Sequence, residues 1–199
     1  LVFKECRHCK IIKLENKKIK KQIKEIFTSK IYANSNQTSA IKQASRKKIT
    51  KKRIDHQVDL IKKYFPNLQS KIKFLDIGCF DGAFLKLLRK NYPNSICYGY
   101  DINLFFKKKI NSIKNCFFLK NLTEPKISEI DCVIFSHSLQ YLNNVKKVIK
   151  VIDKFLNING KILVQIPNID KNIFYSLMAD QEYIFTEENL INLFQLKNF

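Results

Sequence analysis

Glycine is scarce in this sequence, with only 4 glycines among 199 residues. Two of them, Gly78 and Gly82, lie in the single stretch FLDIGCFDGAFLKLL (residues 74–88). Glycine readily adopts a positive φ and lets another group approach the backbone closely. The concentration of glycine in one turn therefore indicates that this turn has a special backbone geometry.

A long apolar run is also lacking. No stretch of about 18 or more apolar residues is present, so we expect no membrane span. The first residues, LVFKECRHCK, are too short and too charged for a secretory signal. Because 45% of the residues are hydrophobic, the chain can bury a substantial core, and its length suggests one domain of ordinary size.

Without a secretory signal, the six cysteines indicate a reduced, cytoplasmic protein rather than a disulfide framework. Cys97, Cys116 and Cys132 lie in or beside apolar runs, where we expect buried thiols. Cys6 and Cys9 have the Cys-x-x-Cys spacing of half a zinc site. Zinc usually takes four ligands, and no second pair stands nearby.

Acidic residues are few: 17 stand against 37 lysines and arginines, which gives a formal net charge of +20. Such a balance raises the possibility of nucleic-acid binding. The excess is almost all lysine and is spread over the whole chain. Nucleic-acid grooves usually combine arginine and aromatic residues in the basic patch, and arginine is scarce here. A nucleic-acid partner therefore stays an alternative.

Apolar residues at helical spacing predict two helices in the first third of the chain. One covers residues 15–29, and the other covers 41–65 and ends at Pro66. The polar stretch 31–40 between them predicts a loop.

From residue 66 onward, predicted strands and helices alternate. Strands are expected at 73–77, 95–100, 116–119, 131–136 and 161–167, and helices at 81–91, 103–113, 144–157 and 186–196, with a turn at Asn159-Gly160. This alternation predicts an α/β fold with a doubly wound, mostly parallel sheet and helices on both faces. The continuous apolar strands suit a sheet that is covered on both sides.

The glycine turn follows the first of these strands. In an open α/β sheet, ligands bind at the carboxyl ends of the strands. A dinucleotide needs G-x-G-x-x-G, whereas this turn is G-x-x-x-G and follows Asp76. An acid suits a ligand that has a positive centre and no phosphate. Asp101 closes the second strand, where its carboxylate could accept two hydrogen bonds from ribose hydroxyls.

FLDIGCFDGAFLKLL and YGYDIN together resemble the first two motifs of the class I S-adenosylmethionine-dependent methyltransferases. NCFFLKNL (115–122), IDCVIFSHSLQYLNN (130–144) and NGKILVQIPN (159–168) resemble the family's later motifs in the same order. The resemblance covers about residues 40–199 and implies a Rossmann-like fold. Phe80-Asp81 depart from it, because the family commonly has a glycine before a small residue there.

For the methionine end of the cofactor, the resemblance implies that Asp76 orders the turn and faces the amino-acid group. Gly78 and Gly82 would line the methionine moiety, and Asp101 would bind the ribose.

For the remainder of the cofactor, the resemblance implies that Ile102 and Leu122 sandwich the adenine. Asn121, where the family often has an acid, would meet the adenine edge. Ser136 and His137 would border the sulfonium. His137 is the candidate base for an acceptor that must lose a proton, because the unperturbed pKa of histidine is near neutral.

Both ends of the chain resemble segments of particular relatives. VFKECRHCKII resembles the second knuckle of the zinc ribbon in relatives near the sugar C-methyltransferases, which implies a fragment whose Cys6 and Cys9 would bind zinc in the full-length protein. QEYIFTEENLINLFQLKNF resembles the segment before the family's sixth strand, so we expect the sheet to end before its sixth and seventh strands. The expected divisions are a partial zinc-ribbon-like segment (1–14), a helical extension (15–65) and the methyltransferase domain (66–199).

Together these observations predict methyl transfer to a small molecule, such as a sugar nucleotide or a lipid or quinone precursor. An RNA methyltransferase is the main alternative, although SHSLQY stands where base-methylating enzymes have an Asn-Pro-Pro-Tyr-like motif. A Rossmann oxidoreductase is disfavoured by the lack of G-x-G-x-x-G. A binding module without turnover is the fourth possibility. The sequence leaves the oligomeric state open.

Overall fold

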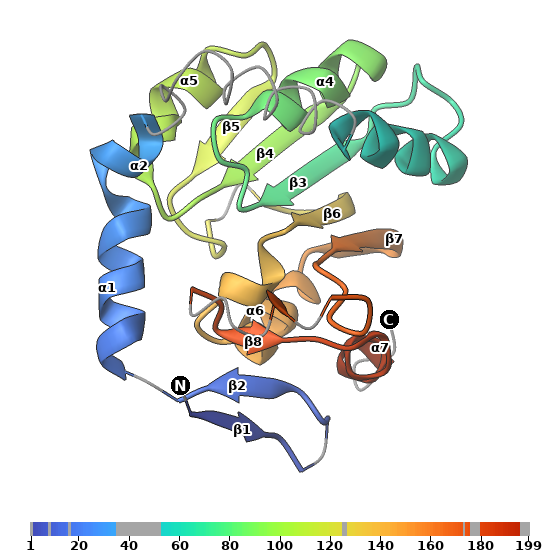
Figure 1. Ribbon diagram of the computed structural model, residues 1–199. Coiled ribbons are helices and arrows are strands. Elements are labelled where there is room, and N and C mark those ends of the chain that lie inside the picture. Colours follow the sequence, from blue (N-terminus) through green and yellow to red (C-terminus); the bar gives the residue numbers. More distant parts are fainter. Residues whose placement is uncertain are drawn as a thin grey trace.

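The computed structural model describes residues 2–7, 9–15, 17–34, 53–124, 127–172, 174–175 and 180–195. Its main feature is a five-stranded sheet in the order β5-β4-β3-β6-β7, in which all neighbouring strands are parallel (Figure 1). The strands are β3 (Lys73–Ile77), β4 (Ile96–Tyr100), β5 (Cys116–Leu119), β6 (Ile130–Ser136) and β7 (Leu156–Gln165). The predicted α/β parallel sheet is confirmed, whereas the expectation about a sixth and seventh strand stays a prediction.

Helices cover both faces of this sheet (Figure 1). Two buried hydrophobic clusters, one for each face, join the helices to the strands. The first face carries the helical residues 53–64, α4 (Ala83–Asn91), the 3-10 turn η2 (Leu104–Phe106) and α5 (Lys107–Asn111); the second carries the 3-10 turn η3 (Leu139–Tyr141), α6 (Val145–Ile152) and α7 (Glu187–Gln195).

Strand β3 shows why its sequence is apolar almost throughout. Phe74 packs in the cluster under α4, while Leu75 and Ile77 pack in the cluster over α6. Alternate residues of a strand point to opposite faces, so a strand covered on both sides needs apolar residues at every position. Cys97 and Cys132 pair in register with Phe74 on the neighbouring strands. Both thiols are buried and neither forms a disulfide, as expected.

A second, three-stranded antiparallel sheet was not predicted. It consists of β1 (Phe3–Glu5), β2 (Ile12–Leu14) and β8 (Tyr183–Ile184), in the order β1-β2-β8. The first two strands form a hairpin, which places the amino-terminal residues beside β8 (Figure 1). Each strand has only two or three residues, so their apolar pattern is too short to distinguish strand from loop.

The helices α1 (Lys17–Thr28) and α2 (Lys30–Asn34) lie beside the carboxyl ends of the large sheet (Figure 1). Ser29 separates the two helices, and its hydroxyl accepts a hydrogen bond from the amide of Tyr32 at 3.0 Å. The buried Asn103, in the loop after β4, donates its side-chain amide to the carbonyls of Phe27 (2.8 Å) and Ser29 (3.1 Å). An ion pair of 2.6 Å between Lys20 and Glu182 also attaches α1 to the domain.

Several predicted boundaries differ from those observed. Residues 31–34 belong to α2 instead of a loop, while predictions for 35–52 fall outside the described residues. The predicted helix 103–113 is split between η2 and α5. The predicted helix 144–157 ends at Ile152, because β7 begins at Leu156 and its pairing with β6 overrides helical propensity. None of the described helices is long and apolar enough to cross a membrane.

The predicted Asn159-Gly160 turn corresponds to an irregularity within β7. Ile130 pairs with Leu156 and Cys132 with Lys161, so β7 carries extra residues between these two pairs. The side-chain amide of Asn157, one of the extra residues, donates to a carboxylate oxygen of Asp131 at 2.6 Å. This bulge keeps β7 continuous where a turn was expected.

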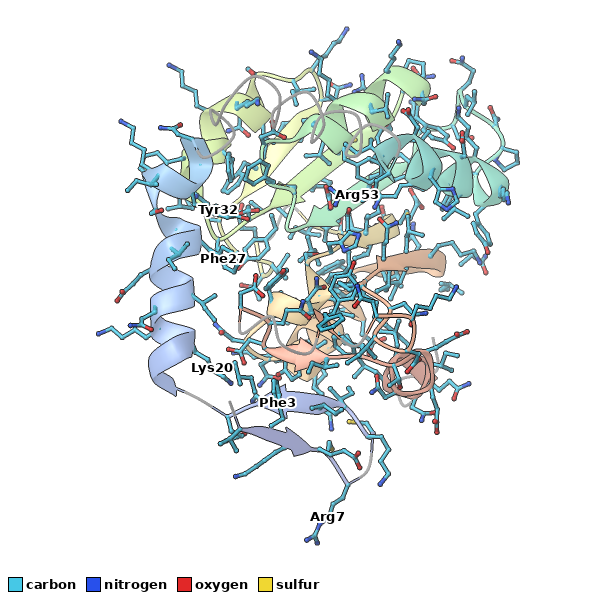
Figure 2. All side chains as sticks on the ribbon, in the orientation of Figure 1. Phe3, Arg7, Lys20, Phe27, Tyr32 and Arg53 are labelled. Carbon is cyan, nitrogen blue, oxygen red and sulfur yellow. The ribbon has the colours of Figure 1, made fainter. Side chains whose placement is uncertain are left out.

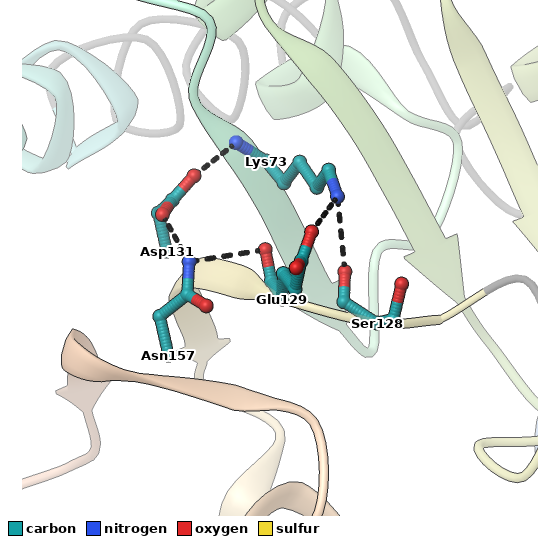
Figure 3. Close-up of polar contacts among 5 residues, drawn as sticks. All are labelled: Lys73, Ser128, Glu129, Asp131 and Asn157. Carbon is teal, nitrogen blue, oxygen red and sulfur yellow. Dashed lines mark hydrogen bonds and ion pairs between the residues drawn. The ribbon is translucent and has the colours of Figure 1, made fainter.

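Asp131 also ties β6 to β3. Its second carboxylate oxygen accepts the backbone amide of Lys73 at 2.8 Å, and the Lys73 ammonium reaches Glu129 (3.0 Å) and the carbonyl of Ser128 (3.3 Å) (Figure 3). One carboxylate thus holds together the amino-terminal halves of three neighbouring strands.

Replacing Asp131 by alanine should lower the free energy of unfolding by about 2–3 kcal/mol, because it removes two charge-assisted hydrogen bonds and leaves a strand amide without its acceptor. Urea unfolding measures this change. Asp153→Asn, at an exposed position, is the control and should change stability by less than about 0.5 kcal/mol. Equal unfolding midpoints for Asp131→Ala and the control would contradict the structural role of Asp131.

Candidate active site

A cavity of about 480 Å³ lies at the carboxyl ends of β3, β4 and β6. Phe27 and Tyr32 reach it from the α1–α2 segment, and Arg53 comes from the start of the helical residues 53–64 (Figure 2). A second hollow of about 380 Å³ shares part of this lining. The two hollows have in common Phe27, Tyr100, Ile102, Tyr141, Leu142 and Asp180.

The glycine turn forms one wall of the larger cavity, and Gly78 lies in it. Its φ of +84° is in the left-handed region that favours glycine. A Cβ atom at this position would lie 2.4 Å from Cβ of Ser138, so no side chain fits. The Ser138 hydroxyl itself donates to the carbonyl of Ile77, which fixes the loop after β6 against the turn.

At position 82, glycine is required for a different reason. It adopts a φ of +77° directly before α4, and a Cβ there would lie 2.9 Å from Cγ1 of Ile110. Gly82 is not among the described residues that line the cavity. Its position therefore explains the close packing of α4 against α5, and the expected contact with a methionine moiety stays a prediction.

Phe80, where the resemblance suggested a glycine, also has a positive φ, of 47°. A bulky side chain in this region is strained. The ring packs against Phe106 with centroids 4.5 Å apart. The backbone amide of Phe80 donates to Asp101 at 2.9 Å. These contacts hold the turn in its unusual conformation.

The carboxylate of Asp101 organises the end of β4. One oxygen accepts the amide of Phe80, and the other accepts the amide of Asn103 at 2.8 Å. Burial raises the pKa of Asp101, while these two hydrogen bonds oppose the rise. Each oxygen keeps a lone pair that can accept a further donor from the cavity.

Asp76, at the end of β3, is only 2% exposed. Its Oδ1 atom is buried and has no hydrogen-bond partner among the described residues. Burial raises the pKa of Asp76 to about 7; the charge of Asp101 adds to the rise, and Arg53 opposes it. The Nε atom of Arg53 is likewise buried without a described partner. Both residues line the cavity, and each has a buried polar atom without a partner among the described residues.

His137 follows β6 with a φ of 54°, and its backbone amide donates to the carbonyl of Gln165 at 2.8 Å. Burial, with a smaller contribution from Arg53, lowers the pKa of His137 to about 4. This lowering opposes the near-neutral pKa from which His137 was expected to act as a base, and its catalytic role stays a prediction. Its neighbour Ser136 lines the same cavity and accepts a hydrogen bond of 2.7 Å from the side-chain amide of Gln57.

Of the three residues expected around an adenine, the structure places two in the lining of the hollows and one outside it. Ile102 is 44% exposed and lines both hollows, and Leu122 lines the smaller one. Asn121 lines neither among the described residues. Its side-chain oxygen accepts the amide (3.0 Å) and hydroxyl (2.8 Å) of Thr123 in a local turn.

Sequence reasoning assigned no role to several residues of the cavity. Phe27, Arg53 and Asp180 lie outside the quoted motifs, and Tyr141 lies in the motif 130–144 but beyond its strand. Phe27 packs edge-to-face against Tyr32 (centroids 5.0 Å apart) and Tyr141 (5.4 Å). The Tyr141 hydroxyl donates to Asp180 at 3.5 Å. Arg53 could have been suspected from the scarcity of arginine, but nothing in the sequence places it near Asp76.

The expected zinc ligands Cys6 and Cys9 lie at the turn of the β1–β2 hairpin. Backbone hydrogen bonds close this turn, from the amide of Cys6 to the carbonyl of Ile11 and from the amide of Lys10 to the carbonyl of Cys6, both 2.9 Å. Cys9 is 1% exposed and packs in the core of the α6 face. Across the described ranges, no group of three or more His, Cys, Asp or Glu side chains could hold a metal ion. The zinc prediction is therefore not supported.

Replacing Gly78 by alanine should lower the free energy of unfolding by about 2–4 kcal/mol, because the left-handed backbone and the contact with Ser138 each add strain. Denaturant unfolding measures the loss. The double variant Gly78→Ala/Ser138→Gly removes the contact but keeps the backbone strain, so it should lose less stability than the two single changes together. A Gly78→Ala variant as stable as the unmodified protein would contradict this account.

Comparison with known proteins adds a family to this geometry. A family model described as a methyltransferase domain matches residues 47–199. Among curated proteins, probable polyketide synthases 22 and 23 of Dictyostelium discoideum are 30% and 29% identical over 156 residues. These matches cover 64% of this chain, and the chain spans only 6% of each synthase.

Solved structures show the same fold at low sequence identity. YcgJ of Bacillus subtilis has a TM-score of 0.59 and is 16% identical, with 71% of this chain and 67% of that chain covered. The plantazolicin methyltransferase BpumL in complex with S-adenosylhomocysteine has a TM-score of 0.55 and is 16% identical over 89% and 71% of the two chains. Coclaurine N-methyltransferase, bound to N-methylheliamine and S-adenosylhomocysteine, has a TM-score of 0.55 and is 15% identical over 70% and 46%. The chain belongs to the methyltransferase-domain family and contains a class I S-adenosylmethionine-dependent methyltransferase domain.

Proposed function

We propose that this domain methylates a small-molecule acceptor and that Asp76, Arg53 and Asp101 bind S-adenosylmethionine in the larger cavity. The observation that carries the cofactor site is the pair of orphaned groups on Asp76 and Arg53. The amino-acid end of the cofactor has an ammonium and a carboxylate group. A buried carboxylate and a buried guanidinium are the matching partners, and both would gain the hydrogen bonds that they lack.

The other cofactor contacts follow from the same cavity. Asp101 has lone pairs left for the ribose hydroxyls after its two backbone bonds. Ile102 and Leu122 offer apolar surface for the adenine. Gly78 lets the ligand approach the backbone, and Ser136 and His137 border the cavity beyond the turn.

When bound, the cofactor supplies a methyl group that its sulfonium already activates for displacement. The chain then has to position the acceptor and exclude water, and positioning accounts for most of the acceleration in such a reaction. Phe27 and Tyr32, which line the cavity from α1 and α2, would provide that enclosure.

Charge favours a small-molecule acceptor over RNA. Four aspartates line the cavity: Asp76, Asp81, Asp101 and Asp180. Asp81 forms an ion pair with Lys109 at 2.7 Å, and the other three would repel a phosphate backbone, although the net charge of the chain is +20. The same carboxylates disfavour the pyrophosphate of a dinucleotide. A sugar nucleotide, or a lipid or quinone precursor, would have to present a neutral or cationic part to this cavity.

Replacing Asp101 by alanine should weaken S-adenosylhomocysteine binding by about 10–100-fold, which corresponds to about 1.4–2.8 kcal/mol. The variant loses the ribose acceptor and the bonds that hold the turn. Calorimetric titration measures the affinity, with NADH as a ligand that should not bind and with Asp153→Asn as the control variant. Unchanged affinity in Asp101→Ala, or failure of the folded unmodified protein to bind, would overturn the assigned site.

The affinity for S-adenosylhomocysteine should depend on pH through Asp76. The pKa of Asp76 in the ligand-free protein is about 7, and only the ionised carboxylate attracts the ligand's ammonium. Affinity should therefore rise by about 10-fold between pH 6 and pH 8, as the ionised fraction increases. Asp76→Asn should bind more weakly at pH 8 and lose most of this dependence. Calorimetry at several pH values, with circular dichroism to verify folding, tests it; a flat profile for the unmodified protein would contradict the role of Asp76.

A further inference from the structure

We propose that the methyl acceptor is an amine, whose nitrogen is held by Asp180 against the rings of Phe27, Tyr32 and Tyr141. This inference rests on the proposed function, because it assigns the acceptor side of the same site. None of these four residues belongs to the glycine turn or to the strand ends that the cofactor is expected to occupy.

Asp180 stands where the two hollows meet, since it lines both of them. Its Oδ2 atom receives the hydroxyl of Tyr141 at 3.5 Å. Its Oδ1 atom is buried and has no hydrogen-bond partner within the described part of the chain. A buried carboxylate oxygen is costly unless a donor, preferably a cationic one, satisfies it. An amine or ammonium nitrogen in the cavity would be such a donor.

The rings on this side suit a cation as well. Phe27 touches both Tyr32 and Tyr141 edge-to-face, and all three rings line the larger cavity. Aromatic faces attract an ammonium group electrostatically, especially where water is excluded. Tyr32 comes from α2, Phe27 from α1 and Tyr141 from η3, so segments that are distant in the sequence meet around one point.

Among the described residues, the positive charges near Asp180 either interact with other acidic side chains or lie at the protein surface. Lys20, which lines the smaller hollow, forms the 2.6 Å ion pair with Glu182. Lys24 and Lys147 line the same hollow but are exposed, and exposed charges are screened by salt. Arg53 also lines the larger cavity, where the negative charge of Asp76 offsets its positive charge.

The chemistry of an amine also fits the bases that are present. The nitrogen lone pair forms the new bond to the methyl carbon as the carbon–sulfur bond breaks, and the positive charge passes from the sulfonium to the product ammonium. A proton carried by an incoming ammonium has to leave before the attack, to Asp180 or to water. Burial raises the pKa of Asp180, while its hydrogen bonds with Tyr141 and with its own backbone oppose the rise. A hydroxyl acceptor would need a stronger base, and the pKa of His137, about 4, makes it a weak one.

The test uses 2-phenylethylamine and its neutral counterpart 2-phenylethanol as probes. Each is titrated by calorimetry into the full chain saturated with S-adenosylhomocysteine, and the methylated amine is sought by mass spectrometry with S-adenosylmethionine present. We expect the amine to bind at least about 10-fold more tightly than the alcohol. Equal or tighter binding of the alcohol by the unmodified protein would overturn the proposal without the need for any variant.

Two variants then test whether Asp180 causes the preference for the amine over the alcohol. Asp180→Asn keeps the shape of the side chain and should abolish the preference for the amine, with the affinity for S-adenosylhomocysteine unchanged. Asp153→Asn removes a distant negative charge and should retain the preference. If Asp180→Asn also retains it, the proposal fails.

A competing role for Asp180 and the rings is to stabilise the sulfonium of the cofactor itself. In that case Asp180→Asn would weaken binding of S-adenosylmethionine much more than that of S-adenosylhomocysteine and leave the amine preference intact, which would overturn the proposal. Failure of the folded unmodified protein to bind S-adenosylhomocysteine at all would instead refute the proposed function.

Discussion

The site depends on one carboxylate with two backbone donors. Asp101 accepts the amides of Phe80 and Asn103 and so connects the glycine turn to the end of β4. Asn103 in turn donates its side chain to the carbonyls at the junction of α1 and α2. Asp101 and Asn103 together therefore link the turn to the segment that brings Phe27 and Tyr32 to the cavity. Without Asp101, the strained backbone of Phe80 would lose the hydrogen bond that restrains its amide.

The same region concentrates negative charge in a protein that is otherwise strongly basic. Asp76, Asp101 and Asp180 line one cavity, and the pKa of each is raised by burial. Arg53 is the opposing charge there. For a ligand in this cavity, we expect the local balance to matter more than the net charge of +20, because charges that are close and partly buried interact more strongly. This balance favours a zwitterionic or cationic ligand and disfavours phosphate.

Much of the fold was predictable because it is coded locally. The strand Cys116–Leu119 was predicted with its observed ends, and Lys73–Ile77 likewise, because both are short apolar runs between polar residues. The β1-β2-β8 sheet was not predictable, because Tyr183–Ile184 forms a strand only by pairing with residues near the other end of the chain. The helix predicted over 144–157 ended early for the same reason: strand pairing at Leu156 outweighed a local preference.

The strand-end side of the cavity could be read from the local sequence. Asp76, Gly78 and Asp101 follow directly from strand ends, and parallel strands bring their carboxyl ends to one edge. The other side of the cavity depends on how distant segments pack together. The tertiary structure placed Arg53 near Asp76, joined Phe27, Tyr141 and Asp180, removed Asn121 to a local turn and lowered the pKa of His137. These outcomes depend on long-range packing and burial, which cannot be inferred from the spacing of neighbouring residues.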